Sequence, residues 1–127
     1  MKYREITENI IGAAFEVHKE LGSGFPEVIY QRACVIEFEK CDISFKREFS
    51  MPVYYRGHHI GIRRVDFLVE EMIPVELKAT SKLDDCHLWQ ALNYLEAWNA
   101  EVGLLLNFGS KSLEIKRLIN LKFKPKS

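Results

Sequence analysis

Two charged residues interrupt an apolar run near the middle of the chain. Residues 73–79 read Ile-Pro-Val-Glu-Leu-Lys-Ala, which predicts a buried strand apart from Glu76 and Lys78. Side chains alternate across a strand, so Glu76 and Lys78 lie on the same face. Because burying a charge is costly unless it is paired or bound to a metal, these two residues mark a candidate site.

A third charged residue, Asp66, lies in the preceding expected strand. A tight connection at residues 70–72 folds that strand back, which places Asp66 beside Glu76 if the register holds. Carboxylates are ligands that Mg²⁺ and Mn²⁺ prefer, and such an ion activates water and polarises a phosphate oxygen. Lys78 could position or deprotonate that water, or stabilise developing charge. The alternative is a partly exposed salt bridge, and the spacing alone favours it.

Two further groups of residues could contribute to the same chemistry. Glu27 lies in the first turn of an expected helix, where the helix dipole favours an anion, and Tyr30 follows one turn later. His87, Gln90 and Tyr94 form a polar stripe on a later helix, from which a glutamine could bind substrate or water. Alternatively, Glu27 is an ordinary surface residue and Tyr30 belongs to the core. The polar stripe could likewise be an ordinary amphipathic surface, which is the preferred interpretation for His87.

The elements that must position these residues follow from periodicity and turn signals. Residues 22–24 and Pro26 separate the first two helices, and Pro52 indicates an edge strand or a bulge. A turn is expected at residues 56–59. The predicted elements are helices at 6–21 and 26–40, strands at 43–55, 60–69 and 73–79, a helix capped at 84–85 and ending near 98, and strands at 101–107 and 113–119. This order predicts an α/β fold around a mixed sheet.

Composition sets limits on the class of protein. The 127 residues suit a single domain spanning 1–127, and Lys+Arg equals Asp+Glu at 18 each. The zero net charge excludes a generally basic protein but permits a local basic groove. Cys34, Cys41 and Cys86 form no C-x-x-C pair, and an odd number argues for free thiols. With no apolar run resembling a membrane span or signal peptide, we expect a cytoplasmic protein that does not bind membranes.

The motifs together resemble those of the GxxExxY family, a group of small bacterial and archaeal proteins within the PD-(D/E)XK nuclease superfamily. The naming motif matches as Gly24-x-x-Glu27-x-x-Tyr30, and its usual lead-in matches at residues 18–24. The acidic pair and lysine of the superfamily match as Asp66 and Glu76-x-Lys78. The helix with Gln90 and Tyr94, and the segment 103–109, also resemble family features, so the resemblance covers nearly the whole chain.

The resemblance implies a fold, a site and a reaction. The fold is a restriction-endonuclease-like α-β-β-β-α-β core, a mixed sheet flanked by helices, with an extra N-terminal helix and a C-terminal strand. Asp66, Glu76 and Glu27 would bind Mg²⁺ or Mn²⁺, and Lys78, Glu27 and Gln90 would be the catalytic residues. The remaining site residues would bind substrate: Tyr30, Arg63, Arg64 and Tyr94. The reaction would be hydrolysis of a nucleic-acid phosphodiester, and we expect DNA rather than RNA as the partner.

Two other hypotheses remain open. The chain could be a non-catalytic module that keeps the nuclease fold and binds nucleic acid or protein. It could also form a homodimer, because exposed aromatic residues often mark interfaces and Phe25, Trp89 and Trp98 are candidates. The alternative for the tryptophans is that they complete the core. Likewise, Arg63 and Arg64 could grip phosphate or be ordinary surface arginines on an outer strand.

Overall fold

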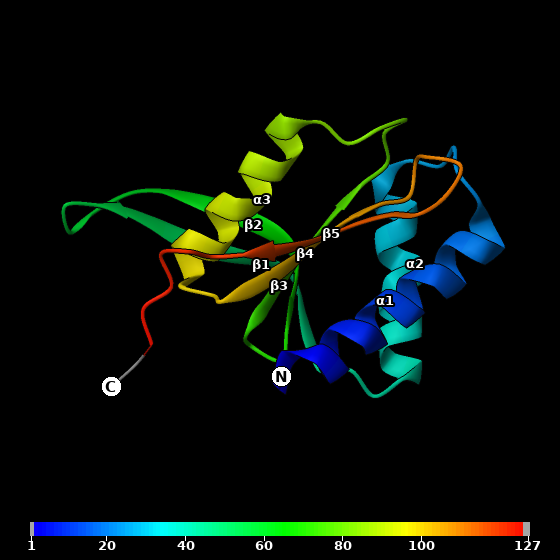
Figure 1. Ribbon diagram of the computed structural model, residues 1–127, viewed down its shortest axis with the longest axis horizontal. Helices are drawn as coiled ribbons and strands as arrows, with labels where there is room; N and C mark the ends of the chain where they lie inside the picture. The colour runs from blue at the N-terminus through cyan, green and yellow to red at the C-terminus, as the bar shows by residue number, and fades with distance from the viewer. Residues whose placement is uncertain (1, 126–127) are drawn as a thin grey trace.

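The computed structural model describes residues 2–125 and contains eight regular elements in the expected order. They are α1 (Lys2–Leu21), α2 (Glu27–Lys40), β1 (Phe45–Tyr55), β2 (His58–Val69), β3 (Ile73–Lys78), α3 (Asp85–Trp98), β4 (Val102–Asn107) and β5 (Glu114–Ile119). The predicted α/β fold is confirmed. Figure 1 shows two N-terminal helices on one side of a central sheet and α3 on the other.

The five strands form one mixed sheet in sequence order, β1-β2-β3-β4-β5. Neighbouring strands are antiparallel except β3 and β4, which run parallel. A parallel connection needs a crossover, and α3 supplies it between β3 and β4. The predicted meander followed by a helical crossover is therefore the observed topology.

The larger core lies between the sheet and the α1–α2 pair. α1 packs through Ile10, Ala14 and Val17, which recur at helical spacing and are buried, as expected. The sequence pattern of α2 predicts an inner side that includes Ala33, Ile36 and Phe38, and this prediction is wrong for Ile36, which is 67% exposed. The buried positions are Tyr30, Gln31, Cys34 and Phe38, which follow the i, i+4 spacing.

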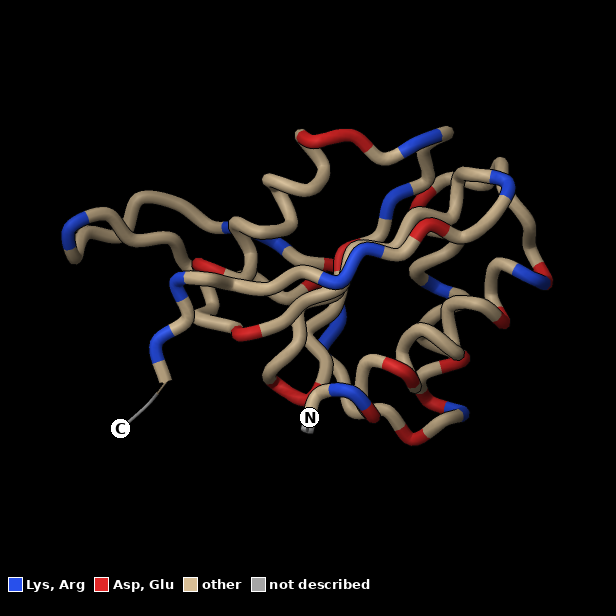
Figure 2. Tube along the Cα trace, viewed as in Figure 1, with Lys and Arg blue, Asp and Glu red and all other residues tan. Residues whose placement is uncertain are grey.

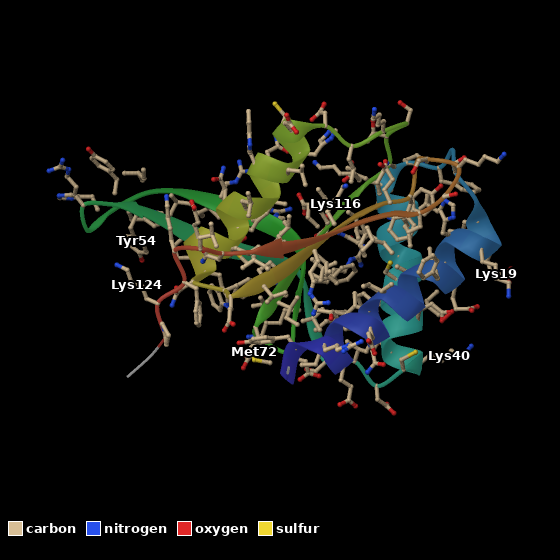
Figure 3. The ribbon with its side chains drawn as sticks, viewed as in Figure 1. Lys19, Lys40, Tyr54, Met72, Lys116 and Lys124 are labelled. Carbon is tan, nitrogen blue, oxygen red and sulfur yellow. The ribbon has the colours of Figure 1, made fainter. Side chains whose placement is uncertain are left out.

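The opposite face of the sheet packs against α3. Asp84 caps this helix by accepting a hydrogen bond from the His87 backbone, as the sequence predicts. Leu95 packs so closely on β4 that a Cβ at Gly103 would lie 2.4 Å from its Cδ1. Glycine at this position therefore allows α3 to approach the strand beside β3 (Figure 3 shows the side chains between these layers).

The turn between β1 and β2 is shorter than predicted. Arg56 and Gly57 both have positive φ and connect the strands, whose last pair is Tyr55↔His58. His58 and His59 therefore belong to β2 rather than to the turn, although both are exposed as expected. β1 is an edge strand, and its register shifts between Val53 and Tyr54, so both structures suggested by Pro52 occur. None of the helices in residues 2–125 is long and apolar enough to cross a membrane.

Candidate active site

Asp66 lies where β2 and β3 separate. The two strands pair from Val69↔Ile73 to Phe67↔Val75, and the next opposed residues would be Asp66 and Glu76. Asp66 Oδ2 accepts a hydrogen bond from the Leu77 backbone N–H at 2.8 Å, and the Asp66 N–H donates to Glu76 Oε1 at 3.2 Å. Carboxylates thus replace backbone carbonyls as the partners of these amides. The predicted proximity of Asp66 and Glu76 is observed.

Gln31 orients Asp66 from α2. Its Nε2 donates to Asp66 Oδ1 at 2.7 Å, and its Oε1 accepts from Arg47 Nε at 2.7 Å. The glutamine is buried, whereas Arg47 on β1 is exposed. Both oxygens of Asp66 therefore have one protein donor each, and each keeps a lone pair for a further partner.

Glu76 is a buried carboxyl group on the α3 side of the sheet. Its Oε2 lies 3.1 Å from the Tyr94 hydroxyl, which is also 2.9 Å from the Arg64 carbonyl oxygen. Burial first, and then the adjacent Asp66 carboxylate, raise the pKa of Glu76 to about 9, while Lys78 opposes the shift. Burial also raises the pKa of Tyr94. Without a cation, this carboxyl group is therefore held in its protonated form at neutral pH.

Lys78 ends β3 and is held in place by the strand beside it. Asn107, its partner in register on β4, is fully buried and accepts from the Thr80 N–H at 3.0 Å while donating to the Thr80 carbonyl at 2.9 Å. A Cβ at Gly109 would lie 2.3 Å from Thr80 N, so only glycine fits against this segment. These contacts fix the backbone that follows Lys78, whose side chain is half-buried and shares a face with Glu76.

Glu27 is the first residue of α2, and the charges of Asp66 and Lys78 affect the pKa of its carboxyl group. Its side chain is at the surface, yet removal of water around its carboxyl group raises its pKa. Lys78 lowers that pKa, Asp66 raises it and His87 lowers it. The charges of Lys78, Asp66 and His87 thus act on Glu27, but no hydrogen bond or ion pair among the described residues joins Glu27 to them. The place of Glu27 in the acidic site stays a prediction.

Tyr30 lies in the core rather than at the surface. Its ring stacks on Phe108 with centroids 4.8 Å apart, and its hydroxyl donates to the Gly22 carbonyl at 2.6 Å. The same hydroxyl accepts from the Phe25 N–H at 3.2 Å. Tyr30 therefore anchors the loop before α2, where Gly24 has a φ of 111°, and so positions Glu27.

Three other predicted residues surround Glu76 and Tyr94. The Arg63 guanidinium lies 5.2 Å from the centre of the Tyr94 ring, and Arg63 Nε is buried without a hydrogen-bond partner among the described residues. Arg64 and Gln90 are exposed. Gln90 precedes Tyr94 by four residues on α3, so helical spacing places the two on one face of the helix.

The donor set suits an oxygen-preferring divalent cation. Asp66 and Glu76 supply carboxylate oxygens, and the high pKa of Glu76 reflects a buried negative charge that a cation would compensate. Within residues 2–125, however, no group of three or more His, Cys, Asp or Glu side chains is close enough to hold a metal. Two carboxylates converge, and Glu27 is nearby without completing a three-residue cluster.

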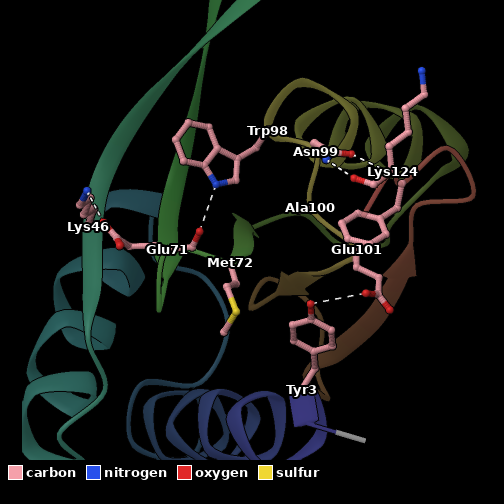
Figure 4. A pocket seen from close by; sticks show the side chains of 10 residues that line it. Tyr3, Lys46, Glu71, Met72, Trp98, Asn99, Ala100, Glu101 and Lys124 are labelled. Atoms are coloured by element: carbon pink, nitrogen blue, oxygen red, sulfur yellow. Dashed lines mark hydrogen bonds and ion pairs between the residues drawn. The ribbon is translucent and has the colours of Figure 1, made fainter. Parts of the chain in front are cut away.

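A separate hollow lies at the other end of β2 and β3 (Figure 4). It is bounded by the start of α1, the β2–β3 turn and the end of α3, and Trp98 Nε1 donates there to the Glu71 carbonyl at 3.1 Å. Across it, the Tyr3 hydroxyl lies 3.5 Å from Glu101 Oε1. None of the predicted site residues lines this hollow, so it is distinct from the acidic site.

A mixed sheet with paired carboxylates at separating strands, and a lysine two residues later on the same face, defines a nuclease-like α/β fold. The family model described as PD-(D/E)XK nuclease superfamily matches residues 4–118. The chain therefore belongs to the PD-(D/E)XK nuclease superfamily. No curated protein and no solved structure matches it.

The sequence interpretation missed the contribution of Gln31 and Asn107. Gln31 follows Glu27 by four residues, so helical spacing already places the two on one face of α2. That spacing could have identified Gln31 as a site residue. No comparable signal exists for Asn107, whose role depends on the parallel register of β3 and β4.

Proposed function

We propose that this protein is a metal-dependent nuclease that hydrolyses phosphodiester bonds in nucleic acid, and we expect DNA rather than RNA as its substrate. The observation that carries the proposal is the convergence of Asp66 and Glu76 where β2 and β3 separate, with Lys78 on the same face as Glu76. Superfamily membership supports it, since the superfamily is typically metal-dependent and acts on nucleic acid. We further propose that the chain is a single domain and that it belongs to the narrower GxxExxY group. The motif formed by Gly24, Glu27 and Tyr30 supports the second proposal.

Asp66 and Glu76 are the proposed ligands of Mg²⁺ or Mn²⁺, with Glu27 as a third acidic residue nearby. A divalent ion at such a site supplies positive charge to the phosphate and lowers the pKa of bound water. Gln31 holds Asp66 in position, and the Tyr94 hydroxyl holds Glu76. These hydrogen bonds orient the carboxylates before any ligand arrives, which is the usual way in which outer residues tune a metal site.

Lys78 is the proposed residue that acts on the attacking water or on the charge that develops at phosphorus. Its backbone is fixed by Asn107, so the ammonium group can be presented at a constant distance from Glu76. Gln90 is an accessory residue one helical turn from Tyr94, while Arg63 and Arg64 would contact substrate phosphates. Tyr30 contributes through the loop that presents Glu27, because its hydroxyl is already bonded within the protein.

One observation favours a second function, a non-catalytic nucleic-acid-binding module with a retained nuclease fold. The described residues contain no cluster of three metal-ligating side chains, and Glu76 prefers a proton when no cation is present. Such a module would bind nucleic acid without metal-dependent turnover.

Calorimetry combined with cleavage assays tests both functions. Mg²⁺ and Mn²⁺ are titrated into wild-type protein and into an Asp66→Ala, Glu76→Ala double variant, and the same samples are assayed on labelled single- and double-stranded DNA and RNA. The nuclease proposal predicts metal binding and metal-dependent cleavage by wild type alone. Metal binding without cleavage of any substrate would favour the binding module. Equal metal binding by both proteins would refute the assignment of the acidic site.

A further inference from the structure

Residues 49–65 of the β1–β2 hairpin form an arm. Its base packs against α3 through the buried Met51 and Val65, and its outer part extends beyond the helices (Figure 1, at the left). The arm contains Arg56, Arg63 and Arg64 with His58 and His59, and no Asp or Glu. The whole chain, in contrast, balances 18 basic with 18 acidic residues. Arg56 lies in the turn that ends the arm, and Figure 2 shows basic residues in blue at that end. Positive charge is thus concentrated on one projecting element of a neutral protein.

Aromatic side chains accompany this charge at the end of the arm. Tyr54 is 61% exposed and Tyr55 is 58% exposed, so neither contributes much to a core. The Tyr54 ring meets His59 edge-on at 5.7 Å, and Arg56 lies over the Tyr55 ring at 5.5 Å and donates to its hydroxyl at 3.2 Å. Exposed aromatic rings beside an arginine occur on nucleic-acid-binding surfaces, where arginine contacts phosphate and the rings contact bases or sugars.

The turn at the tip of the arm contains Arg56, a residue type that its positive φ does not favour. Arg56 has a φ of 48° and Gly57 a φ of 81°, as at the two central positions of a type I′ turn. Asn, Asp or Gly is preferred at the first of these positions, because a longer side chain is strained there. The turn geometry therefore does not explain the arginine, whose local contacts are those with Tyr55 and whose charge lies at the projecting end of the arm.

The arm is continuous with the acidic site. β2 runs from His58 at the tip to Asp66 without a break. Eight residues at about 3.3 Å each span roughly 26 Å, which corresponds to about eight base pairs of duplex at 3.4 Å each. A duplex whose cleaved phosphate lay at Asp66 would therefore have its next several base pairs within reach of the arm.

We propose that the arm binds a nucleic-acid duplex about eight base pairs from the cleaved phosphate, contacting the backbone through Arg56 and the groove through Tyr54 and Tyr55. This inference rests on the proposed nuclease function for the placement of the substrate. The competing occupant is a second copy of this chain, since Ile60 and Ile62 are also exposed. A symmetric dimer in which the two arms met at the two-fold axis would oppose like charges, so a polyanion is the better partner.

The test compares long and short duplexes in full-length protein. The arm variant is Tyr54→Thr, Tyr55→Thr, Arg56→Asn, in which threonine suits a strand and asparagine suits the turn, so folding is preserved. The control is Lys19→Ala, Lys40→Ala, which removes exposed cations from α1 and α2 (Figure 3 labels both lysines). Kd is measured by fluorescence anisotropy with hairpin-capped DNA duplexes of about 8 and 24 base pairs, in an Asp66→Ala background that prevents cleavage.

The proposal predicts that the arm variant binds the longer duplex at least about tenfold more weakly, whereas binding of the shorter duplex and binding by the control variant are unchanged. Arg56→Asn alone should lower the slope of log Kd against log salt by about one for the longer duplex. In the wild-type background, the arm variant should still cut the shorter duplex at the normal rate.

Unchanged affinity of the arm variant for the longer duplex would overturn the proposal. A wild-type dimer in light scattering that the arm substitutions convert to monomer would also overturn it, in favour of self-association. Failure of the nuclease function is distinguishable from either result. If wild type cuts nothing but binds the longer duplex through the arm, the arm proposal stands while the catalytic one falls.

Discussion

Gln31 offers a sharp test of how the acidic site is positioned. We consider Gln31→Leu, which keeps the approximate volume of the side chain but removes both of its hydrogen bonds. The bond lost at Asp66 is short, 2.7 Å, and its acceptor is a carboxylate. Hydrogen bonds to charged groups contribute about 1.5–3 kcal/mol. Gln31 also loses its hydrogen bond to Arg47. Because Arg47 is exposed, water can replace that bond, so its loss adds little to the cost.

A similar free-energy range follows from the general effect of residues that orient metal ligands. Removing a residue that orients a ligand weakens metal affinity about 10- to 100-fold, which corresponds to about 1.4–2.8 kcal/mol. We therefore expect Gln31→Leu to weaken Mn²⁺ binding by 10- to 100-fold in calorimetry. Arg47→Ala should weaken it less, because Arg47 reaches Asp66 only through Gln31. Gln31→Glu should not restore affinity, since a second carboxylate would repel Asp66.

Thr7→Val is the matched control for a purely structural effect. Thr7 is also a buried polar residue on a helix and also accepts from an arginine, Arg117 Nη2, at 2.8 Å. It lies on α1 and contacts none of the site residues. Both variants should lose about 1–2 kcal/mol of unfolding free energy, but only Gln31→Leu should lose metal affinity. Wild-type affinity in Gln31→Leu would refute the assignment of Gln31 as a positioning residue.

Three further predictions follow from buried groups. Asn107→Leu should lower Tm by roughly 8 °C or more in a thermal melt, because it leaves the Thr80 backbone unbonded; a normal Tm would contradict this. Burial raises the pKa of the Cys34 thiol to about 12, so a thiol reagent at pH 8 should modify exposed Cys41 and Cys86 but reach Cys34 only on unfolding; three reactive thiols in the native state would contradict it. Burial lifts the pKa of Glu76 from 4.5 to about 9, so its contribution to stability is complete below about pH 4.5 and is lost as pH rises towards 9. Metal-free Glu76→Gln should therefore become more stable than wild type as pH rises from 5 to 8, and a constant difference would show that the group does not titrate as inferred.

The sequence predicted the fold because each element carried a strong local signal. The alternation around Glu76, the periodicity of Ile10, Ala14 and Val17, and the Asp84 cap all depend on short-range chemistry. The error at Ile36 has the opposite origin. α2 has apolar residues around much of its circumference, so only tertiary packing decides which of them face inward.

The acidic site was predictable where it depended on strand alternation and register, as for Asp66 and Glu76. It was less predictable where it depended on three-dimensional packing. Tyr30 was expected to bind substrate but lies in the core, because its ring stacks on Phe108, a residue far away in the sequence. The turn at residues 56–59 was predicted two residues too long, because Arg56 and Gly57 alone connect the strands and His58 and His59 already belong to β2.

Lys78 provides the most direct test of the central claim. The rate of cleavage of a labelled duplex is measured at saturating Mg²⁺ for wild type, for Lys78→Met and for a control, Lys82→Met, which removes an exposed lysine four residues later. The account predicts that Lys78→Met loses at least about a hundredfold in rate while keeping wild-type affinity for metal and duplex, and that Lys82→Met cuts normally. Cleavage by Lys78→Met at the wild-type rate would contradict the assignment of this centre as the active site.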